Sequence, residues 1–176
     1  QLAFEPIDMG PMLGQPAGQS TIGGVVATNL SGSRRIQSGA VRDHVLGLKA
    51  VNGQGEIIKA GGRVMKNVTG YDLCRGLAGS WGTLGLFTEV TLRAQPAADE
   101  SRTLLLFGQP DEIAVEVMCA AIGSQFEVSG AIHLQEALTR RLRSPAARSV
   151  GTDVTALRIE SFGLAVARRA AALRDL

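Results

Sequence analysis

The sequence has few of the features that identify several large classes of protein. Aromatic residues make up only 4% of its 176 residues. No apolar run approaches the ~18 consecutive residues that a membrane-spanning helix requires. The first residues lack a basic stretch followed by a long apolar one, so we expect no signal peptide in this sequence. These absences predict a cytoplasmic protein.

The sequence also has few cysteines and a small net charge. Cys74 and Cys119 lie far apart and form no CxxC pair, which excludes an iron–sulfur cluster or structural zinc site made by this chain alone. We expect both thiols to be buried, reduced and unreactive. The formal net charge is +2, which gives no support for nucleic-acid binding.

The residues that are present describe a globular protein whose two halves differ in composition. Hydrophobic residues make up 45% of the chain and charged residues 19%, which is sufficient for an apolar core. Seventeen of the 22 glycines lie at or before Gly85, and five follow it. Because Pro and small residues at 95–99 end a strand, we predict one domain over residues 1–97 and a second over 98–176.

Short β-rich runs and turn residues dominate the first half. Val45–Val51 and Glu56–Ala60 flank an Asn-Gly sequence, which is a strong short-range signal for a β-hairpin. Asp72–Ala78 is predicted to be a short helix with a glycine near its end. Leu84–Arg93 is rich in Leu, Phe, Val and Thr and is predicted to be a strand.

In the second half, predicted strands and helices alternate. We predict strands at Arg102–Phe107, Ala131–Leu134 and Val154–Ile159, and helices at Pro110–Ile122 and Leu164–Leu173. A Pro and two acids begin the first of these helices, where both are favourable. This order predicts an α+β fold with an antiparallel sheet.

The stretch from Ser20 to Gly32 is the most informative part of the first half. Small hydroxylated residues and paired glycines allow backbone N–H groups to face a phosphate or ring oxygen without obstruction. The stretch contains neither a GxGxxG dinucleotide motif nor a GxxxxGK[ST] phosphate loop. Taken alone, it therefore fits either a ligand-binding loop or ordinary tight turns.

Four motifs in a fixed order are more specific. They read STIGGxxATNxSG, RDxVLGLxxVNGxGE, KNVTGYDL and GSxGTLGLxTEVTLR. Together they resemble the PCMH-type FAD-binding domain of the vanillyl-alcohol-oxidase family, and within it the smaller flavin subunits of bacterial glycolate oxidases. The resemblance is close over residues 4–96 and looser beyond. It implies the second subdomain of the FAD-binding domain, followed by part of a ferredoxin-like α/β cap domain.

The resemblance also implies a set of cofactor contacts. FAD would be bound noncovalently, because no His lies in a flavin-attachment setting. Arg42 and Asp43 match the family's RD pair, which we interpret as a structural ion pair. The residues predicted to bind the cofactor are Gln15, Gln19, Ser20, Thr21, Gly23, Gly24, Ala27, Thr28, Asn29, Gly32, Gly82, Thr83, Leu84, Gly85 and Leu86.

Two departures from the family pattern affect this expectation. The family's first phosphate-binding loop would lie before Gln1, and Trp81 stands where many relatives carry Glu. Both ends of the sequence look truncated. We therefore expect this chain alone to be inactive, to hold FAD weakly or lack it, and to self-associate through its uncovered cofactor face.

The function implied is a FAD-dependent oxidoreductase subunit acting on a 2-hydroxy acid such as glycolate. Its implied partners are a larger flavin subunit and an iron–sulfur subunit, which could hold it peripherally at the inner membrane. Two alternatives stay open: a free-standing D-lactate dehydrogenase-like FAD enzyme, and a non-catalytic assembly module without flavin. The sequence identifies no catalytic residue.

The two histidines are weaker candidates for chemistry. His44 follows the RD pair, and we expect a hydrogen-bonding residue on the surface or in a loop rather than a general base. His133 lies in an apolar strand and is predicted to be a packing residue. We predict no metal site within the chain.

Overall fold

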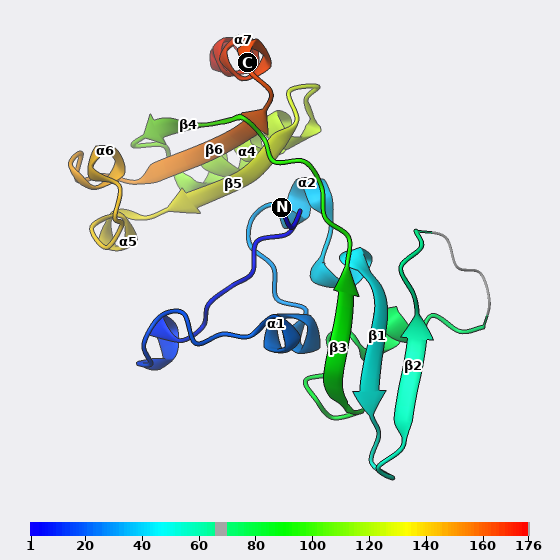
Figure 1. Ribbon diagram of the computed structural model, residues 1–176. Helices are drawn as coiled ribbons and strands as arrows, with labels where there is room; N and C mark the ends of the chain where they lie inside the picture. The colour runs from blue at the N-terminus through cyan, green and yellow to red at the C-terminus, as the bar shows by residue number, and fades with distance from the viewer. Residues whose placement is uncertain (66–69, 176) are drawn as a thin grey trace. The chain divides into compact units, whose positions relative to one another are not determined.

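The computed structural model describes residues 1–65 and 70–175, which form two compact units, Gln1–Pro96 and Ala97–Leu176 (Figure 1). The predicted motif KNVTGYDL falls partly outside the described residues, because its first four residues, 66–69, are not among them.

The first unit combines a three-stranded sheet with short helices. Its strands are antiparallel and lie in the order β2-β1-β3. Its elements are η1 (Pro11–Leu13), α1 (Ile22–Thr28), α2 (Arg35–Ser38), η2 (Val41–His44), β1 (Val45–Val51), β2 (Ile57–Gly61), α3 (Leu73–Leu77) and β3 (Leu86–Leu92).

The β1–β2 hairpin confirms the prediction made from the Asn-Gly sequence. Val51 pairs with Ile57 at the end of the ladder. Between them, the side-chain oxygen of Asn52 accepts the N–H groups of Gln54 and Glu56, each at 2.9 Å. An Asn that bonds its own following backbone is a standard way to close a turn, so the register of the hairpin is set locally.

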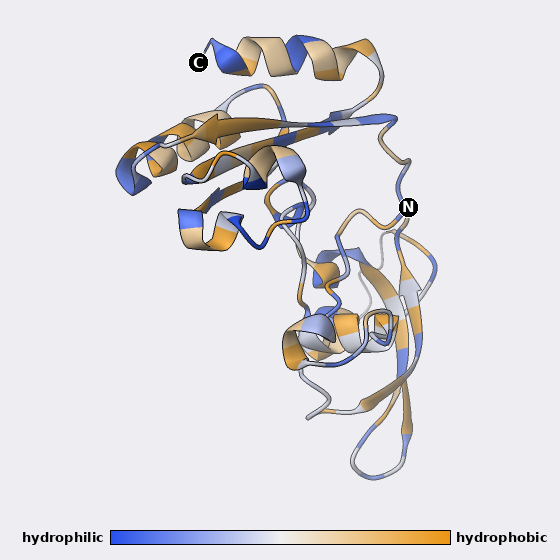
Figure 2. Cartoon of the chain, turned by 90° about the vertical axis from the view of Figure 1, so that its left-hand side faces the viewer, coloured by the Kyte–Doolittle hydropathy of each residue, from blue (hydrophilic) through white to orange (hydrophobic). Residues whose placement is uncertain are grey.

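The core of this unit lies between β1 and the short helices. The apolar face of β1 contributes Leu48 and Ala50, which are buried against Phe4 and the two valines of α1, Val25 and Val26. Figure 2 shows apolar residues along the strands and helices that meet there. Burial of this kind is the main favourable contribution to folding.

The second unit is an antiparallel α+β arrangement, as predicted. Its three strands lie in the order β4-β6-β5. Apart from the short helices α5 and α6 between β5 and β6, the order β4-α4-β5-β6-α7 matches the first five elements of a ferredoxin-like unit. Its elements are β4 (Glu100–Phe107), α4 (Asp111–Gly123), β5 (Val128–Leu134), α5 (Glu136–Thr139), α6 (Pro145–Arg148), β6 (Val154–Ser161) and α7 (Leu164–Arg174).

Helices α4 and α7 both contribute to the core of the second unit. Ala121 of α4 and Leu173 of α7 are buried with Leu157 and Ile159 of β6. Helix α4 begins after Pro110, with Asp111 and Glu112 in its first turn, as predicted. Acids in this turn are stabilised by the positive end of the helix dipole.

Three sequence expectations need correction. Ile22–Thr28, interpreted as turns or an N–H loop, is a helix, because burial of its valines outweighs the low helix propensity of its glycines. Cys74 is buried as expected, and burial raises the pKa of its thiol, whereas Cys119 is exposed. His44 is buried rather than at the surface.

The described helices include none that is long and apolar enough to cross a membrane. The longest is α4 with 13 residues.

Candidate functional site

The first glycine-rich stretch forms helix α1 and the turn that precedes it. The hydroxyl of Thr21 accepts the N–H of Gly24 at 3.1 Å, which caps the helix. Val25 and Val26 point into the core. A Cβ at Gly23 would come within 4 Å only of the Thr21 hydroxyl. The first turn of α1 therefore has an open face without side chains.

The polar residues at the end of α1 are engaged within the unit. The hydroxyl of Thr28 donates to the carbonyl oxygen of Gly24 at 2.9 Å. Asn29 adopts a left-handed conformation with φ of 55°, and its side-chain oxygen accepts the N–H of Arg42 at 2.9 Å. Asn tolerates this conformation better than most residues. The side chain of Asn29 thus links the end of α1 by a hydrogen bond to the segment that leads into β1.

The second glycine-rich stretch packs directly against the end of the first. The N–H of Gly79 donates to the carbonyl of Val26 at 3.0 Å, and the N–H of Trp81 to that of Ala27 at 2.8 Å. The Val26 carbonyl also accepts the N–H of Asn29 at 3.2 Å, and the bond from Trp81 supplies a donor to a carbonyl in the last turn of the helix. Gly79, Trp81 and Gly82 all have positive φ, at 88°, 57° and 75°. The fold therefore brings the two stretches together through a tightly curved loop.

Apolar side chains around Gly82 are exposed. Trp81 is 66% exposed, Leu84 59% and Leu86 72%, and a Cβ at Gly82 would meet no atom within 4 Å. The hydroxyl of Ser80 is buried and has no hydrogen-bond partner among the described residues. Exposed apolar groups beside bare backbone and an unsatisfied hydroxyl suit a planar ligand with polar atoms. The residues present thus fit a flavin.

Two of the predicted contact residues are explained by packing. A Cβ at Gly32 would lie 2.5 Å from the Glu5 carboxylate, and the N–H of Gly32 donates to the Glu5 carbonyl at 3.0 Å. A Cβ at Gly85 would lie 3.0 Å from the carbonyl oxygen of Val51 in β1. Both glycines therefore allow close backbone approach within the unit.

Asp8 is a residue of this region that the sequence reasoning missed. Its carboxylate accepts the N–H of Gly18 at 2.7 Å, the hydroxyl of Ser20 at 2.7 Å and the N–H of Gly10 at 3.0 Å. These three bonds hold the pKa of the Asp8 carboxyl below its usual range. The available signal was an acid placed before a loop rich in Gly and Pro.

The Asp8 bonds close the loop that carries the first two predicted contacts. Gln15 and Gln19 lie within this loop and are exposed. Asp8, Gly18, Ser20 and Thr21 line a pocket of about 270 Å³ beside α1, together with Pro6, Ile7, Ile22 and Val25. The loop and the first turn of α1 therefore form one surface.

The RD pair and the histidine after it have structural roles. Asp43 accepts the N–H of Ala40 at 2.9 Å and lies 3.9 Å from Arg75, so Arg75 rather than Arg42 is its ionic partner. His44 Nε2 lies 2.8 Å from the carbonyl oxygen of Ser38, and its Nδ1 lies 3.4 Å from an Arg93 nitrogen.

These contacts indicate a single tautomer of the His44 ring. A carbonyl oxygen only accepts and a guanidinium only donates, so Nε2 carries the proton and Nδ1 accepts. The ring is fully buried and lies 5.6 Å from the Phe4 ring. With its lone pair engaged, His44 is not available as a general base.

Residues 8–61 match the FAD binding domain family. This segment makes up 54 of the chain's 176 residues. It contains helix α1, the Asp8 loop and the β1–β2 hairpin, and the cofactor that it indicates is FAD. Trp81, Leu84 and Leu86 lie beyond the matched segment. The backbone N–H of Trp81 bonds to Ala27 of α1, and Leu86 pairs with Val51 of β1.

Curated relatives of the chain include proteins named as glycolate oxidase subunits and as D-lactate dehydrogenases. "Glycolate oxidase subunit GlcE" of Escherichia coli K12 is 48% identical over 86 residues, which are 49% of this chain and 25% of that protein. "D-lactate dehydrogenase [cytochrome], mitochondrial" of Arabidopsis thaliana is 34% identical over 160 residues, 91% of this chain and 27% of that protein. "Glycolate oxidase subunit GlcD" of Bacillus subtilis 168 is 39% identical over 106 residues, 60% of this chain and 23% of that protein.

The chain thus spans about a quarter of the length of these relatives. Among solved structures, alkyldihydroxyacetonephosphate synthase is similar, with a TM-score of 0.69 and 17% identity. That similarity covers 89% of this chain and 32% of the synthase. At this identity it establishes the fold alone.

Proposed function

We propose that the chain is part of the FAD-binding subunit of a flavin-dependent 2-hydroxy-acid oxidoreductase of the glycolate oxidase type. The observation that carries the proposal is the coincidence of the FAD-family match with the open face of α1. The relatives' names supply the substrate class, because glycolate and D-lactate are both 2-hydroxy acids. Bound FAD supplies the acceptor for a hydride from the carbon that bears the hydroxyl group.

The role of this chain's residues is to bind and orient the cofactor. The hydroxyls of Ser20 and Thr21 and the bare backbone at Gly23 would face its polar groups, without a covalent link. Leu84 and Leu86 would cover an apolar ring face, since both are exposed beside Gly82. Thr28 and Asn29 would influence cofactor binding indirectly, because their side-chain hydrogen bonds shape the end of α1.

The names of two relatives also suggest an assembly. Both GlcE and GlcD are named as subunits of glycolate oxidase, and the chain is similar to each. We therefore propose a larger flavin subunit as partner, with an iron–sulfur subunit completing the enzyme.

A free-standing D-lactate dehydrogenase-like enzyme is the second candidate. One observation favours it: the similarity to the Arabidopsis D-lactate dehydrogenase extends over 91% of this chain, whereas that to the GlcE subunit extends over 49%. The two candidates differ in whether the protein oxidises its substrate without partner subunits.

A flavin-occupancy experiment tests the proposal. The protein is purified in its natural full-length form, reconstituted with FAD, and its flavin absorption and affinity are measured. A Gly23→Val variant places a side chain on the open face of α1 and should lower FAD affinity at least about tenfold, a loss of ~1.4 kcal/mol. Gly53→Val is the matched control, because Gly53 lies in the β1–β2 turn, where a Cβ would meet no atom within 4 Å.

The outcomes separate the candidates. We expect FAD to be released by heat, and glycolate or D-lactate to bleach the flavin anaerobically. Bleaching without partner subunits would favour the D-lactate dehydrogenase-like candidate. A protein that stays colourless after reconstitution would instead point to an assembly module without flavin. Equal FAD affinity of the Gly23 and Gly53 variants would refute the proposal that the open face of α1 contacts FAD.

A further inference from the structure

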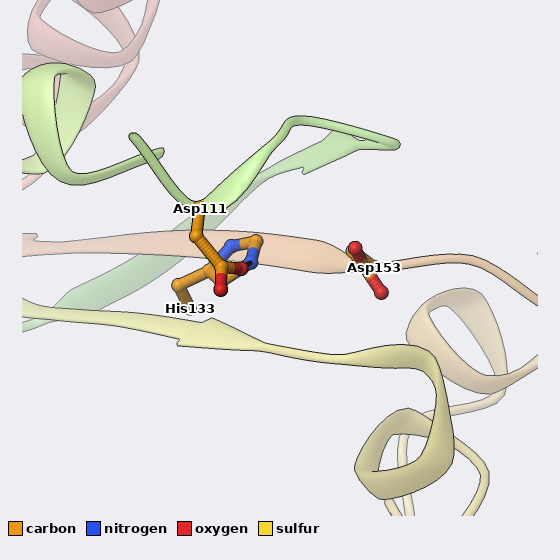
Figure 3. Close-up of side chains that lie close together, drawn as sticks. All are labelled: Asp111, His133 and Asp153. Atoms are coloured by element: carbon orange, nitrogen blue, oxygen red, sulfur yellow. Dashed lines mark hydrogen bonds and ion pairs between the residues drawn. The ribbon is translucent and has the colours of Figure 1, made fainter. Parts of the chain in front are cut away.

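Three side chains with metal-binding chemistry meet in the second unit. Asp111 is the first residue of α4, His133 lies in β5, and Asp153 directly precedes β6. One potential ligand atom from each lies within 4.8 Å of the other two. Figure 3 shows the Asp111 carboxylate beside the His133 ring, with Asp153 farther along the sheet. The cluster is far in sequence from the FAD-binding segment, and the sequence pattern predicted no metal site.

His133 is held in a defined orientation. It pairs with Thr155 across the β5–β6 ladder, and its Nδ1 lies 2.8 Å from the Thr155 hydroxyl, which is buried. Its Nε2 lies 3.1 Å from an oxygen of Asp111. Because a carboxylate oxygen only accepts, this second contact requires a proton on Nε2 or a cation between the two atoms.

Each carboxylate is also held by a partner outside the cluster. One oxygen of Asp153 accepts the N–H of Glu136 at 2.7 Å, and one oxygen of Asp111 accepts the amide of Gln135 at 3.3 Å. Each residue therefore uses one polar atom for positioning and has a second polar atom that can face the cluster. Such outer hydrogen bonds commonly orient the ligands of metal sites.

Two carboxylates around one imidazole leave an excess of negative charge. Arg140 lines the same pocket as Asp111 and Asp153, but its guanidinium is paired with Glu136. The pocket has a volume of about 740 Å³ and opens to solvent, so water could complete a coordination sphere.

We propose that Asp111, His133 and Asp153 bind a divalent first-row transition-metal ion such as Zn²⁺, Co²⁺ or Mn²⁺. An imidazole nitrogen with two carboxylates favours these ions over Mg²⁺ and Ca²⁺, which prefer all-oxygen sites. With metal–ligand bonds of ~2.1 Å, two ligand atoms lie ~3 Å apart at a right angle and at most ~4.2 Å apart. The 3.1 Å contact already fits, and the other two separations, which are at most 4.8 Å, need to shorten only to the ~4.2 Å limit.

The competing explanation is an ordinary ion pair. Protonated His133 would then bind Asp111, whose charge would also stabilise the start of α4. The two explanations differ in what a metal ion does to the protein, so titration separates them.

The experiment uses the whole chain carrying Cys119→Ser, because the exposed Cys119 thiol could otherwise bind zinc. Zn²⁺ and Co²⁺ are titrated separately by calorimetry, with Mg²⁺ as the comparison ion, and Co²⁺ binding is also followed by visible absorption. We expect one saturable site for Zn²⁺ and Co²⁺, a higher melting temperature with the ion bound, and at least tenfold weaker Mg²⁺ binding.

Variants locate the site. His133→Gln and Asp153→Asn should each weaken Zn²⁺ binding at least tenfold, and the outer-sphere change Thr155→Val by on the order of 10-fold. Glu112→Gln is the matched control, since it removes the neighbouring carboxylate in the first turn of α4, and its affinity should match that of the parent. Absence of saturable Zn²⁺ binding, or equal affinities for the His133 and Glu112 variants, would overturn the proposal. Circular dichroism of each variant confirms that loss of binding is not loss of fold.

Discussion

Asn29 offers the sharpest test of how the two glycine-rich stretches are held together. Its backbone is left-handed with φ of 55°, its side chain accepts the N–H of Arg42, and its Cβ would lie 3.2 Å from a Cβ added at Gly79. Replacement by Ala removes the hydrogen bond and places a poorly suited residue in the left-handed region. Replacement by Gly removes the bond alone.

The magnitudes follow from these two contributions. A hydrogen bond of this kind is worth ~0.5–1.5 kcal/mol net, and a left-handed Ala costs ~1–2 kcal/mol. We therefore expect Asn29→Ala to lower the free energy of unfolding by ~1.5–3 kcal/mol, and Asn29→Gly by ~0.5–1.5 kcal/mol. Asn29→Asp keeps an acceptor and should cost at most ~1 kcal/mol, from its charge at the helix C-terminus.

Urea unfolding followed by tryptophan fluorescence measures these differences. Trp81 is the single tryptophan, and its backbone N–H donates to the carbonyl of Ala27 in α1. The fluorescence of its side chain therefore reports on unfolding of the first unit. With a urea dependence of ~1–3 kcal/mol per molar, Asn29→Ala should lower the midpoint by about 1 M. Equal midpoints for the Ala and Gly variants would refute the backbone argument. An Asp variant of unchanged stability that loses FAD would show that Asn29 contacts the cofactor directly.

Two further predictions concern the same surface. Gly79→Ala should destabilise the unit more than Gly82→Ala, because both positions have positive φ but only Gly79 has a neighbour within 4 Å of an added Cβ; thermal melts of both variants decide this. The lowered pKa of Asp8 means that its support of the loop is present above the unfolded-state pKa and is lost as pH falls through the folded value. The Gly18 amide resonance should therefore shift only in acid, and Asp8→Asn should abolish that titration; a transition near neutral pH would contradict the assignment.

Much of the secondary structure was determined by short-range patterns in the sequence. The β1–β2 hairpin follows from an Asn that bonds its own turn, and β1 was predicted with its observed limits, Val45–Val51. Helix α4 follows from Pro and acids at its start. The four ordered motifs indicated FAD through their resemblance to a known family, whereas the Ser20–Gly32 stretch taken alone fitted ordinary tight turns equally well.

Tertiary contacts decided the remaining features. Gly23 and Gly24 are poor helix formers, so α1 depends on burial of its valines and on N–H groups supplied by Gly79 and Trp81. Burial of His44 depends on Phe4, which is remote from it in the sequence.

The side-chain clusters show most clearly what local sequence patterns do not predict. Asp8 gains its bonds only when the loop closes, and Asp111, His133 and Asp153 meet only because α4, β5 and β6 pack together. Local pattern determines which backbone conformations are favourable. Which distant side chains become neighbours is decided by the packing of the elements, because that arrangement alone buries the apolar faces together.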